Sequence, residues 1–313
     1  MRIISLQGER SVEVNQSLYR FVLGFISSKI KISCKLPRKK IAFGWYGGKF
    51  SHLDWLLPLL PHTKHYCEPF GGSAAVLLNR KPSPVETYND IDSELVNFFR
   101  VLRNQREELI QNIGLTPFSR EELRNAVNPK ITSTLTELER ARRFFVRARQ
   151  VRTGLAQTAS EGRWAYCRLT SRAGMAGSVS RWLGSVEGLS EIVQRLLRVQ
   201  IENGDAVSII KRYDSPQTLF YCDPPYPHDS RSDVKAYAYE MTDDQHRELG
   251  KILQKVKGYV AISGYESDLL DEIYGNWHKT AGPVKKANSI KKERQELLFT
   301  NYDPTSLVIS SKL

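Results

Sequence analysis

The string Asp223-Pro224-Pro225-Tyr226 has the most specific chemistry in this sequence. It follows an apolar run, residues 218–222, that predicts a strand, and α/β sheets bind ligands at the carboxyl ends of their strands. Consecutive prolines fix φ and stiffen the turn. The Asp223 carboxylate and the Pro224 carbonyl can each accept one hydrogen from an NH₂ group, which leaves the nitrogen lone pair free to attack. Tyr226 offers a flat face to a planar ring, although an ordinary Pro-Pro turn is the alternative.

A second string, Glu68-Pro69-Phe70-Gly71-Gly72-Ser73, lies between a predicted strand and a predicted helix. Two glycines would let the backbone approach a ligand closely at a helix N-terminus. Asp90 ends the next predicted strand 19 positions after Gly71, close to the roughly 20 typical of nucleoside-binding folds, where the acid holds ribose hydroxyls. The string is not G-x-G-x-x-G, which disfavours a dinucleotide site. A tight turn followed by an unrelated aspartate is the alternative.

A third string, Trp45-Tyr46-Gly47-Gly48-Lys49, precedes the first strand of this series. An aromatic ring, two glycines and a lysine could wrap a charged small molecule. A loop that caps the hydrophobic core is the alternative, and the string alone favours that alternative.

Short apolar runs and helical patterns alternate from Ile41 onward, which is typical of an α/β sheet. The predicted strands are residues 64–68, 85–90, 218–222, 259–263 and 296–301. Helices are predicted to begin at Ser73, to run through Leu95 and Leu102, and to begin again at Thr242, where Thr-x-x-Gln is a capping box. These elements would place the three strings around one sheet edge.

The middle of the chain differs in composition from this pattern. Residues 111–200 hold 14 Arg and one Lys against seven Glu and no Asp, a net charge of +8. Helix starts are predicted at Ser119 and Thr136, each with a glutamate three residues later. We therefore expect a mostly helical domain, residues 111–199, inserted into an α/β domain made of residues 39–110 and 200–313. Residues 1–38 are expected to be an N-terminal extension.

The overall composition indicates which classes of binding partner and which cellular location to expect. A net charge of +12 favours a polyanion, either nucleic acid or an anionic membrane surface. The four cysteines, at 34, 67, 167 and 222, form no C-x-x-C pair, and the six histidines form no ligand-spaced cluster, so we expect free thiols and no metal. The apolar stretch Tyr19–Ile26 is too short to cross a bilayer and is no clear signal peptide. An intracellular, cytoplasmic protein is the expectation.

Taken together, the three strings resemble the Dam-type, or alpha-class, adenine-specific DNA methyltransferases in order as well as content: W-x-G-G-K, then E-P-F-x-G, then an acidic strand end, then D-P-P-Y. The resemblance covers roughly residues 41–104 and 200–302. It implies a Rossmann-like methyltransferase domain that uses S-adenosyl-L-methionine without a metal. It also places a target-recognition domain in the intervening segment.

The resemblance implies a role for each motif residue. Trp45 and Lys49 would line the methionine part of the cofactor, Phe70 would contact it, and Asp90 would hold its ribose. Asp223 and the Pro224 carbonyl would grip the target amine, and Tyr226 would stack on the base. Asp223 would also contact the cofactor. The turn Asn203-Gly204-Asp205 lies where relatives often contact the cofactor's adenine.

The substrate implied is double-stranded DNA. Adenine N6 is buried in a stacked base pair, so the enzyme must flip the nucleotide out, at a cost of a few kcal/mol. Arginine outnumbers lysine in the insert, and its planar fork suits guanine edges and phosphates. The candidate DNA-binding residues are Arg149, Arg152, Arg168 and Arg172.

Other readings stay open at this point. A methyltransferase for another planar amine, such as cytosine N4, an RNA adenine or a glutamine amide, could use a proline-rich acceptor turn. A DNA-binding protein with an inactive methyltransferase core is a second alternative. The sequence gives neither the recognition sequence nor whether a cognate restriction endonuclease exists.

Overall fold

The structure is a computed structural model that describes residues 39–128, 134–152, 154–230, 239–286 and 293–306. The predicted N-terminal extension, residues 1–38, lies outside the described residues, and the chain from Lys39 onward forms one unit.

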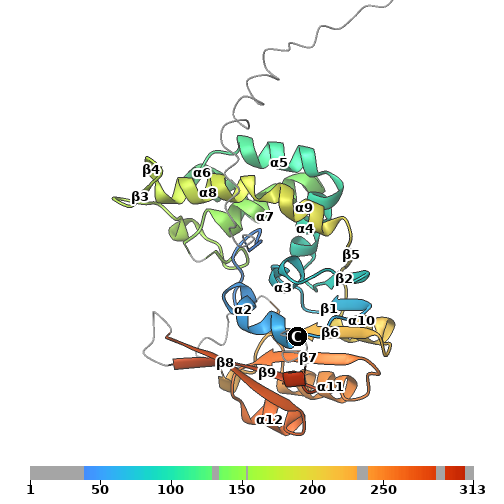
Figure 1. Cartoon of the computed structure of the whole chain (residues 1–313). Coiled ribbons are helices and arrows are strands. Elements are labelled where there is room, and N and C mark those ends of the chain that lie inside the picture. Colours follow the sequence, from blue (N-terminus) through green and yellow to red (C-terminus); the bar gives the residue numbers. More distant parts are fainter. Residues whose placement is uncertain (1–38, 129–133, 153, 231–238, 287–292, 307–313) are drawn as a thin grey trace, which may run out of the picture. The chain divides into compact units, whose positions relative to one another are not determined.

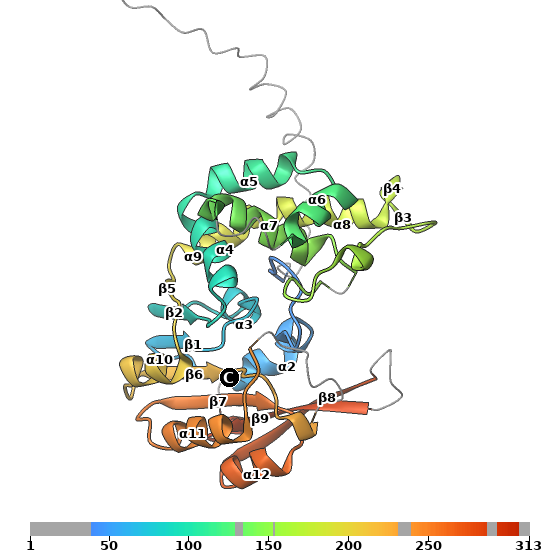
Figure 2. The same ribbon diagram turned by 180° about the vertical axis from the view of Figure 1, so that it is seen from behind.

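The main sheet has seven strands: β1 (His65–Glu68), β2 (Val85–Asn89), β5 (Gln200–Glu202), β6 (Thr218–Cys222), β7 (Tyr259–Gly264), β8 (His278–Lys286) and β9 (Glu293–Thr300). Their order is β5–β2–β1–β6–β7–β9–β8 (Figures 1 and 2). The first five in this order are parallel, whereas β9 runs antiparallel to both β7 and β8. The order reverses between β1 and β6, which makes their carboxyl edge the switch point where such sheets bind ligands.

Helices cover both faces of this sheet because its central strands are apolar on both sides. In β6, Leu219 and Tyr221 join one hydrophobic core and Phe220 and Cys222 join a second, as the alternation of strand side chains requires. The first core includes α2 (Leu53–Leu56), α3 (Ala75–Asn79) and α4 (Ser93–Asn104), and the second includes α10 (Ala206–Tyr213), α11 (Asp243–Leu253) and α12 (Asp268–Tyr274). The predicted α/β class is confirmed.

The predicted elements are present with small shifts at their ends. The capping box at Thr242 is confirmed, with both reciprocal hydrogen bonds to Gln245. The helix predicted to begin at Ser73 begins at Ala75 instead. Gly72 and Ala74 have φ of +49° and +55°, so the chain passes through left-handed conformations before the helix can start.

The segment between β2 and β5 after α4 is mainly helical. It contains α5 (Arg106–Leu115), α6 (Arg120–Val127), α7 (Glu137–Arg149), α8 (Gly177–Glu187), α9 (Leu189–Leu196) and a short hairpin, β3 (Ser171–Arg172) and β4 (Met175–Ala176). The side chains of Ser119 and Thr136 cap α6 and α7 as predicted. These helices gather at the top of Figure 1, away from β7 to β9. Their role as a separate recognition domain stays a prediction.

Short 3-10 helices complete the described elements: η1 (Lys49–His52), η2 (Leu57–Leu59), η4 (Glu161–Arg163) and η5 (His228–Ser230).

Aromatic packing joins the helical segment to the α/β core. The rings of Phe98 in α4 and Phe145 in α7 stack with centroids 5.7 Å apart, and Phe43 packs edge-on against Phe98 and Phe144. The same hydrophobic core extends from Trp182 in α8 to the sheet. The helices therefore have a fixed position relative to the sheet edge.

A buried ion pair makes a second link. Arg195 of α9 pairs through both terminal nitrogens with the Glu86 carboxylate of β2, with one N–O distance of 2.7 Å, and also donates to the Leu77 carbonyl at 2.8 Å. Breaking one partner of such a pair leaves an uncompensated buried charge, which is strongly destabilising.

The described residues contain neither a membrane-spanning helix nor a metal-binding cluster. No described helix is long and apolar enough to cross a membrane. No group of three or more His, Cys, Asp or Glu side chains in the described segments could hold a metal ion. The three described cysteines, Cys67, Cys167 and Cys222, are free, as predicted.

Candidate active site

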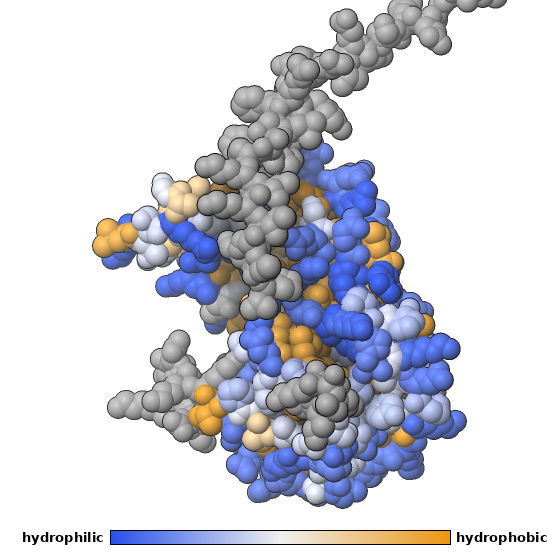
Figure 3. All heavy atoms as spheres, in the orientation of Figure 1, coloured by the Kyte–Doolittle hydropathy of each residue, from blue (hydrophilic) through white to orange (hydrophobic). Residues whose placement is uncertain are grey.

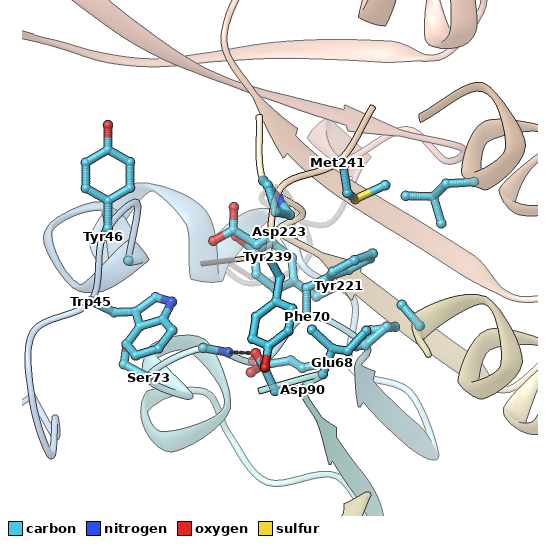
Figure 4. Close-up of a pocket in the computed structure, with 18 of the residues that line it drawn as sticks. Trp45, Tyr46, Glu68, Phe70, Ser73, Asp90, Tyr221, Asp223, Tyr239 and Met241 are labelled. Atoms are coloured by element: carbon cyan, nitrogen blue, oxygen red, sulfur yellow. Dashed lines mark hydrogen bonds between the residues drawn. The ribbon is translucent and has the colours of Figure 1, made fainter. Parts of the chain in front are cut away.

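A cavity of about 420 Å³ opens at the carboxyl ends of β1, β2 and β6 (Figure 4). Its size lies within the roughly 300–1,000 Å³ usual for small-molecule sites, and it occupies the switch point of the sheet. All five residues predicted to bind a cofactor line it: Trp45, Lys49, Phe70, Asp90 and Asp223. Three strings that are far apart in the sequence thus meet in one site.

The two glycines after β1 are required by close packing of the protein itself. A Cβ at Gly71 would overlap the Tyr88 ring, and one at Gly72 would lie 2.9 Å from the Trp45 indole. The Tyr88 hydroxyl also donates to the Gly72 carbonyl at 2.8 Å. The turn therefore lets Trp45 and Tyr88 close around the cavity wall.

Asp90 is fixed at the cavity by two backbone hydrogen bonds. One carboxylate oxygen accepts from the Gly72 N–H and the other from the Asp92 N–H, each at 2.9 Å. A carboxylate has about four lone-pair positions, so two are left for a ligand. Burial raises the pKa of Asp90 to about 6, because water no longer solvates its charge.

Asn89, which the sequence analysis overlooked, holds the neighbouring turns together. Its side-chain amide donates to the Pro69 carbonyl at 2.8 Å and the Gly204 carbonyl at 3.0 Å, and its oxygen accepts from the Gly204 N–H at 2.9 Å. Gly204 and Asp205 line the cavity, so the turn 203–205 forms part of its wall. The signal that could have identified Asn89 is that it is a polar residue at the end of a buried strand.

Lys49 and Asp223 form a buried ion pair. The Lys49 Nζ donates to the two oxygens of Asp223 at 2.6 and 2.8 Å and to the Gly47 carbonyl at 2.7 Å. It also lies 3.2 Å from a carboxylate oxygen of Glu296, which comes from β9. The side chains of Lys49 and Glu296 are 2% and 3% exposed, whereas Asp223 is 18% exposed. Asp223 is therefore the carboxylate of this cluster that faces a ligand.

Burial and the charge of the ion-pair partner act in opposite directions on the pKa values of Lys49 and Asp223. Burial raises the pKa of Asp223 to about 6; the ammonium of Lys49 opposes this rise and the carboxylate of Glu296 adds to it. Burial also lowers the pKa of Lys49, but the two carboxylates outweigh it and the pKa is raised overall. Lys49 is consequently a firmly held cation.

Tyr226 lies behind this cluster. It is 3% exposed, its hydroxyl donates to Glu296, and its ring meets Tyr265 edge-on with centroids 4.8 Å apart. The Lys49 Nζ lies 5.0 Å from the centre of the Tyr226 ring. Among the described residues that line the cavity, Pro225 is present and Pro224 and Tyr226 are not. Of the four residues in this turn, Asp223 has the clearest access to a ligand.

Glu68 of the second string and two residues outside the predicted motifs, Gln157 and Tyr239, also line the cavity. Glu68 accepts from the Tyr66 hydroxyl at 2.6 Å, and burial raises its pKa to about 8. Gln157, from the loop between α7 and α8, donates to Asp92 at 3.1 Å. Tyr239 extends across the cavity beside Asp90 (Figure 4). Gln157 and Tyr239 come from loops without a recognisable motif, so no local pattern pointed to them.

The arginines of the helical segment divide into two sets. Some hold the fold through ion pairs with nearby glutamates: Arg124, Arg140, Arg142, Arg143 and Arg195. Within the described ranges, no carboxylate forms an ion pair with any of the four candidate DNA-binding arginines, Arg149, Arg152, Arg168 and Arg172. No described carboxylate neutralises the charge of this second set, although Arg149 and Arg152 donate to backbone carbonyls.

These four arginines differ in exposure. Arg168, Arg172 and Arg152 are exposed, and Arg172 lies in the β3–β4 hairpin. Arg149 is partly buried, and burial together with the neighbouring Arg181 lowers its pKa to about 10. Figure 3 shows hydrophilic and hydrophobic side chains mixed over the helical segment on the face it presents.

A switch-point sheet with an acidic end to β2 and an acceptor turn after β6 defines a Rossmann-like methyltransferase domain. The model of the D12 class N6 adenine-specific DNA methyltransferase family matches residues 45–294, and the chain belongs to this family. Its activity is therefore methylation of adenine N6 in DNA, and membership implies S-adenosyl-L-methionine as the methyl donor. The predicted family, enzyme class and activity are confirmed.

Two curated proteins that are similar to this chain are also named as methyl-transferring enzymes. The chain is 26% identical over 284 residues to the Type II methyltransferase M1.LlaDCHI of Lactococcus lactis subsp. cremoris, covering 82% of this chain and 94% of the relative. It is 24% identical over 238 residues to the DNA adenine methylase of Vibrio cholerae, covering 73% and 80%. A solved rRNA methyltransferase, aviRa from Streptomyces viridochromogenes, shares 12% identity at a TM-score of 0.34, covering 85% and 86%, which is too loose to support an inference.

Proposed function

We propose that the cavity binds S-adenosyl-L-methionine, with Trp45 and Phe70 against it and Asp90 on its ribose, and that Asp223 accepts a hydrogen from the N6 amine of a flipped adenine. The observation that carries this proposal is that Asp90 and Asp223, at the ends of β2 and β6, line the same cavity.

The charge of the cavity fits this cofactor. One lysine, Lys49, and six acidic residues line it: Glu68, whose raised pKa of about 8 keeps it mostly neutral near pH 7, and Asp90, Asp205, Asp223, Glu240 and Glu248. A ligand that carries a sulfonium and an ammonium group is attracted to such a lining, whereas the phosphates of a dinucleotide would be repelled. The one lysine is already engaged with protein acceptors.

Lys49 acts in this proposal by holding Asp223. An ammonium group has three hydrogens. Gly47, Asp223 and Glu296 together provide an acceptor for each of them. Lys49 thereby fixes the direction of the Asp223 carboxylate, which is the group left facing the ligand.

When bound, the cofactor would supply an electrophilic methyl group to the amine nitrogen. On methylation the amine would lose one proton, for which the Asp223 carboxylate is the adjacent acceptor. Asp223 and the Pro224 carbonyl orient the amine, and the bound substrates exclude water from the reacting atoms. We assign Tyr226 to the base-stacking surface, which requires its ring to become accessible when the base enters.

DNA binding is assigned to the helical segment. Arginines without an ion-pair partner among the described residues supply phosphate contacts, which fix the register of the duplex, and base-edge contacts, which give specificity. The adenine must leave the stack to reach Asp223, so base flipping is part of the proposal. The segment would then act as the target-recognition domain.

The test is methyl transfer from tritiated cofactor to DNA, RNA and protein, with N6-methyladenine identified after digestion of the DNA. We expect label in DNA adenine alone, and loss of label in Asp223→Ala with the cofactor Kd and the melting temperature retained. Because Asp223 must be ionised to accept, kcat should fall as pH drops below about 6. Label in cytosine or RNA would reject the substrate, and near-normal turnover of Asp223→Ala would reject the catalytic assignment.

A cognate restriction endonuclease is a further proposed partner, on the ground that one curated relative is named a Type II methyltransferase. An intracellular, DNA-associated location follows from the same proposal. Cleavage of unmethylated but not methylated DNA by a lysate of the source cells would support such a pair.

A further inference from the structure

We infer that Glu296 is a positioning residue for methyl transfer: from β9 it retains the Lys49 ammonium and the Tyr226 hydroxyl, so that the Asp223 carboxylate can turn to the substrate amine. This inference rests on the role proposed above for Asp223.

The geometry converges on a single oxygen. Oε1 of Glu296 lies 3.2 Å from the Lys49 Nζ and accepts the hydrogen of the Tyr226 hydroxyl. Its side chain is 3% exposed, so water does not compete for these contacts. Burying a carboxylate costs free energy unless the charge is paired. Among the described contacts of the Glu296 side chain, both partners, Lys49 and Tyr226, belong to the site.

Sharing of the ammonium explains why a second carboxylate is needed. Both oxygens of Asp223 are occupied by Lys49 in the structure. Each Asp223 oxygen keeps a second lone pair, but turning one of them toward an entering amine loosens the contact of the carboxylate with the lysine. Glu296 then keeps the lysine hydrogen-bonded, because the ammonium has an alternative anion within reach. Without Glu296, leaving Asp223 would strand part of a buried cation.

The net charge of the cluster leads to the same conclusion. Lys49, Asp223 and Glu296 together carry one negative charge. Positive charge moves onto the amine nitrogen as the new bond forms, and a negative cluster beside that nitrogen favours the movement. With Glu296 neutralised, Lys49 and Asp223 would cancel each other and this contribution would be lost.

Titratable groups from several elements surround Asp223. Lys49 of η1, Glu296 of β9 and Tyr226 act on it directly, and Glu68 of β1 and Tyr221 of β6 lie within electrostatic range. Of these, Glu296 is the carboxylate that raises the pKa of Asp223 most directly. Its removal should therefore lower the pKa of Asp223.

The test compares Glu296→Gln, which is isosteric and uncharged, with Glu86→Gln as a matched control. Glu86 is also a buried, ion-paired glutamate of the sheet, but it pairs with Arg195 and lies away from the cavity. The measurements are single-turnover rates against pH, KM for DNA, cofactor Kd by calorimetry and the melting temperature.

For Glu296→Gln we expect kcat to fall roughly ten- to hundredfold, the scale of a charge-assisted hydrogen bond, while KM for DNA and the cofactor Kd change less than about threefold. The acidic limb of the rate profile should move to lower pH by about one unit, because a neighbouring like charge has gone. Glu86→Gln should lower the melting temperature and leave that limb in place.

A wild-type kcat and acidic limb in folded Glu296→Gln would overturn the inference. If Glu296→Gln does not fold, Glu296→Asp decides: it keeps the charge but withdraws it by one methylene, so kcat should fall with the limb near its wild-type position, and unchanged kcat would overturn the inference. Asp223→Asn is measured in parallel. If it keeps its turnover, the proposed role of Asp223 fails; if it is inactive while Glu296→Gln is normal, only the role of Glu296 fails.

Discussion

Asp90→Asn should weaken cofactor binding far more than it weakens the fold. The structure leaves about two lone-pair positions of the Asp90 carboxylate for the ribose hydroxyls, after the N–H groups of Gly72 and Asp92 have taken two. A hydrogen bond to a charged group contributes about 1.5–3 kcal/mol. At about 1.36 kcal/mol per tenfold, the dissociation constant should rise roughly ten- to 150-fold.

The pH dependence of binding gives the same prediction a second readout. The pKa of Asp90 is about 6 in the free protein, and ribose hydroxyls favour its ionised form. The wild-type affinity should therefore fall as pH drops below about 6, because binding then requires loss of a proton. Asp223 titrates in the same range, so the informative quantity is the difference between the wild-type and Asp90→Asn slopes.

The assay is isothermal calorimetry with the cofactor at several pH values, with thermal unfolding measured in parallel. The control is Asp214→Asn, since the Asp214 carboxylate also accepts backbone N–H groups, from Lys257 and Gly258, but lies outside the cavity. The control should lose some stability and keep the wild-type affinity. An unchanged affinity in folded Asp90→Asn, or an unchanged slope, would refute the ribose assignment.

Three other outcomes are expected. Arg195→Ala should lower the free energy of unfolding by about 3–5 kcal/mol in a denaturant titration, because it leaves the Glu86 charge buried without its partner; a loss below about 1 kcal/mol would contradict this. Burial raises the pKa of Glu68 to about 8, so the folded state keeps a proton that the unfolded state, with its lower Glu68 pKa, has already released. Stability should therefore fall as pH rises from about 5 to 8. Glu68→Gln should flatten this pH dependence in thermal unfolding, and a pH dependence equal to that of the wild type would count against the reasoning. Replacing Arg168 and Arg172 by Gln should weaken DNA binding and lower the log–log salt slope by about 0.9 for each phosphate that is no longer neutralised, with cofactor affinity as the control; wild-type slope, specificity and affinity together would mean that the two side chains are merely solvated.

The sheet was predictable from the sequence where strands are buried on both sides. The run Thr218–Cys222 is apolar throughout and became β6 with the predicted bounds. β5 has three residues, of which none is fully buried, and β8 carries several polar side chains, so neither gave a clear apolar run. Both are edge strands, whose pairing is decided by the neighbouring strand rather than by their own pattern.

Helix starts were predictable where a side chain performs the capping. Thr242, Ser119 and Thr136 all accept backbone N–H groups of the first turn, as their spacing from Gln or Glu predicted. The start of α3 was not predictable in the same way. Its N-cap is Ala74 in a left-handed conformation, which is imposed by the tight turn and by the packing of Trp45 on Gly72.

The motifs predict candidate residues for the chemistry because each motif is local, whereas the partners of these residues are contributed by distant segments. Asp223 and Tyr226 belong to one turn, but the acceptor of the Tyr226 hydroxyl lies 70 positions further on. It reaches the site only because β9 runs antiparallel beside β7 and places Leu297 opposite Gly264. No spacing rule relates such residues. A buried glutamate next to Leu297 in a strand is conspicuous once the strand is known to be internal to the sheet, since an internal strand must find a partner for every charge it buries. In this fold that partner is Lys49, which also holds the proposed catalytic residue Asp223, so the burial of Glu296 and the orientation of Asp223 depend on the same ammonium group.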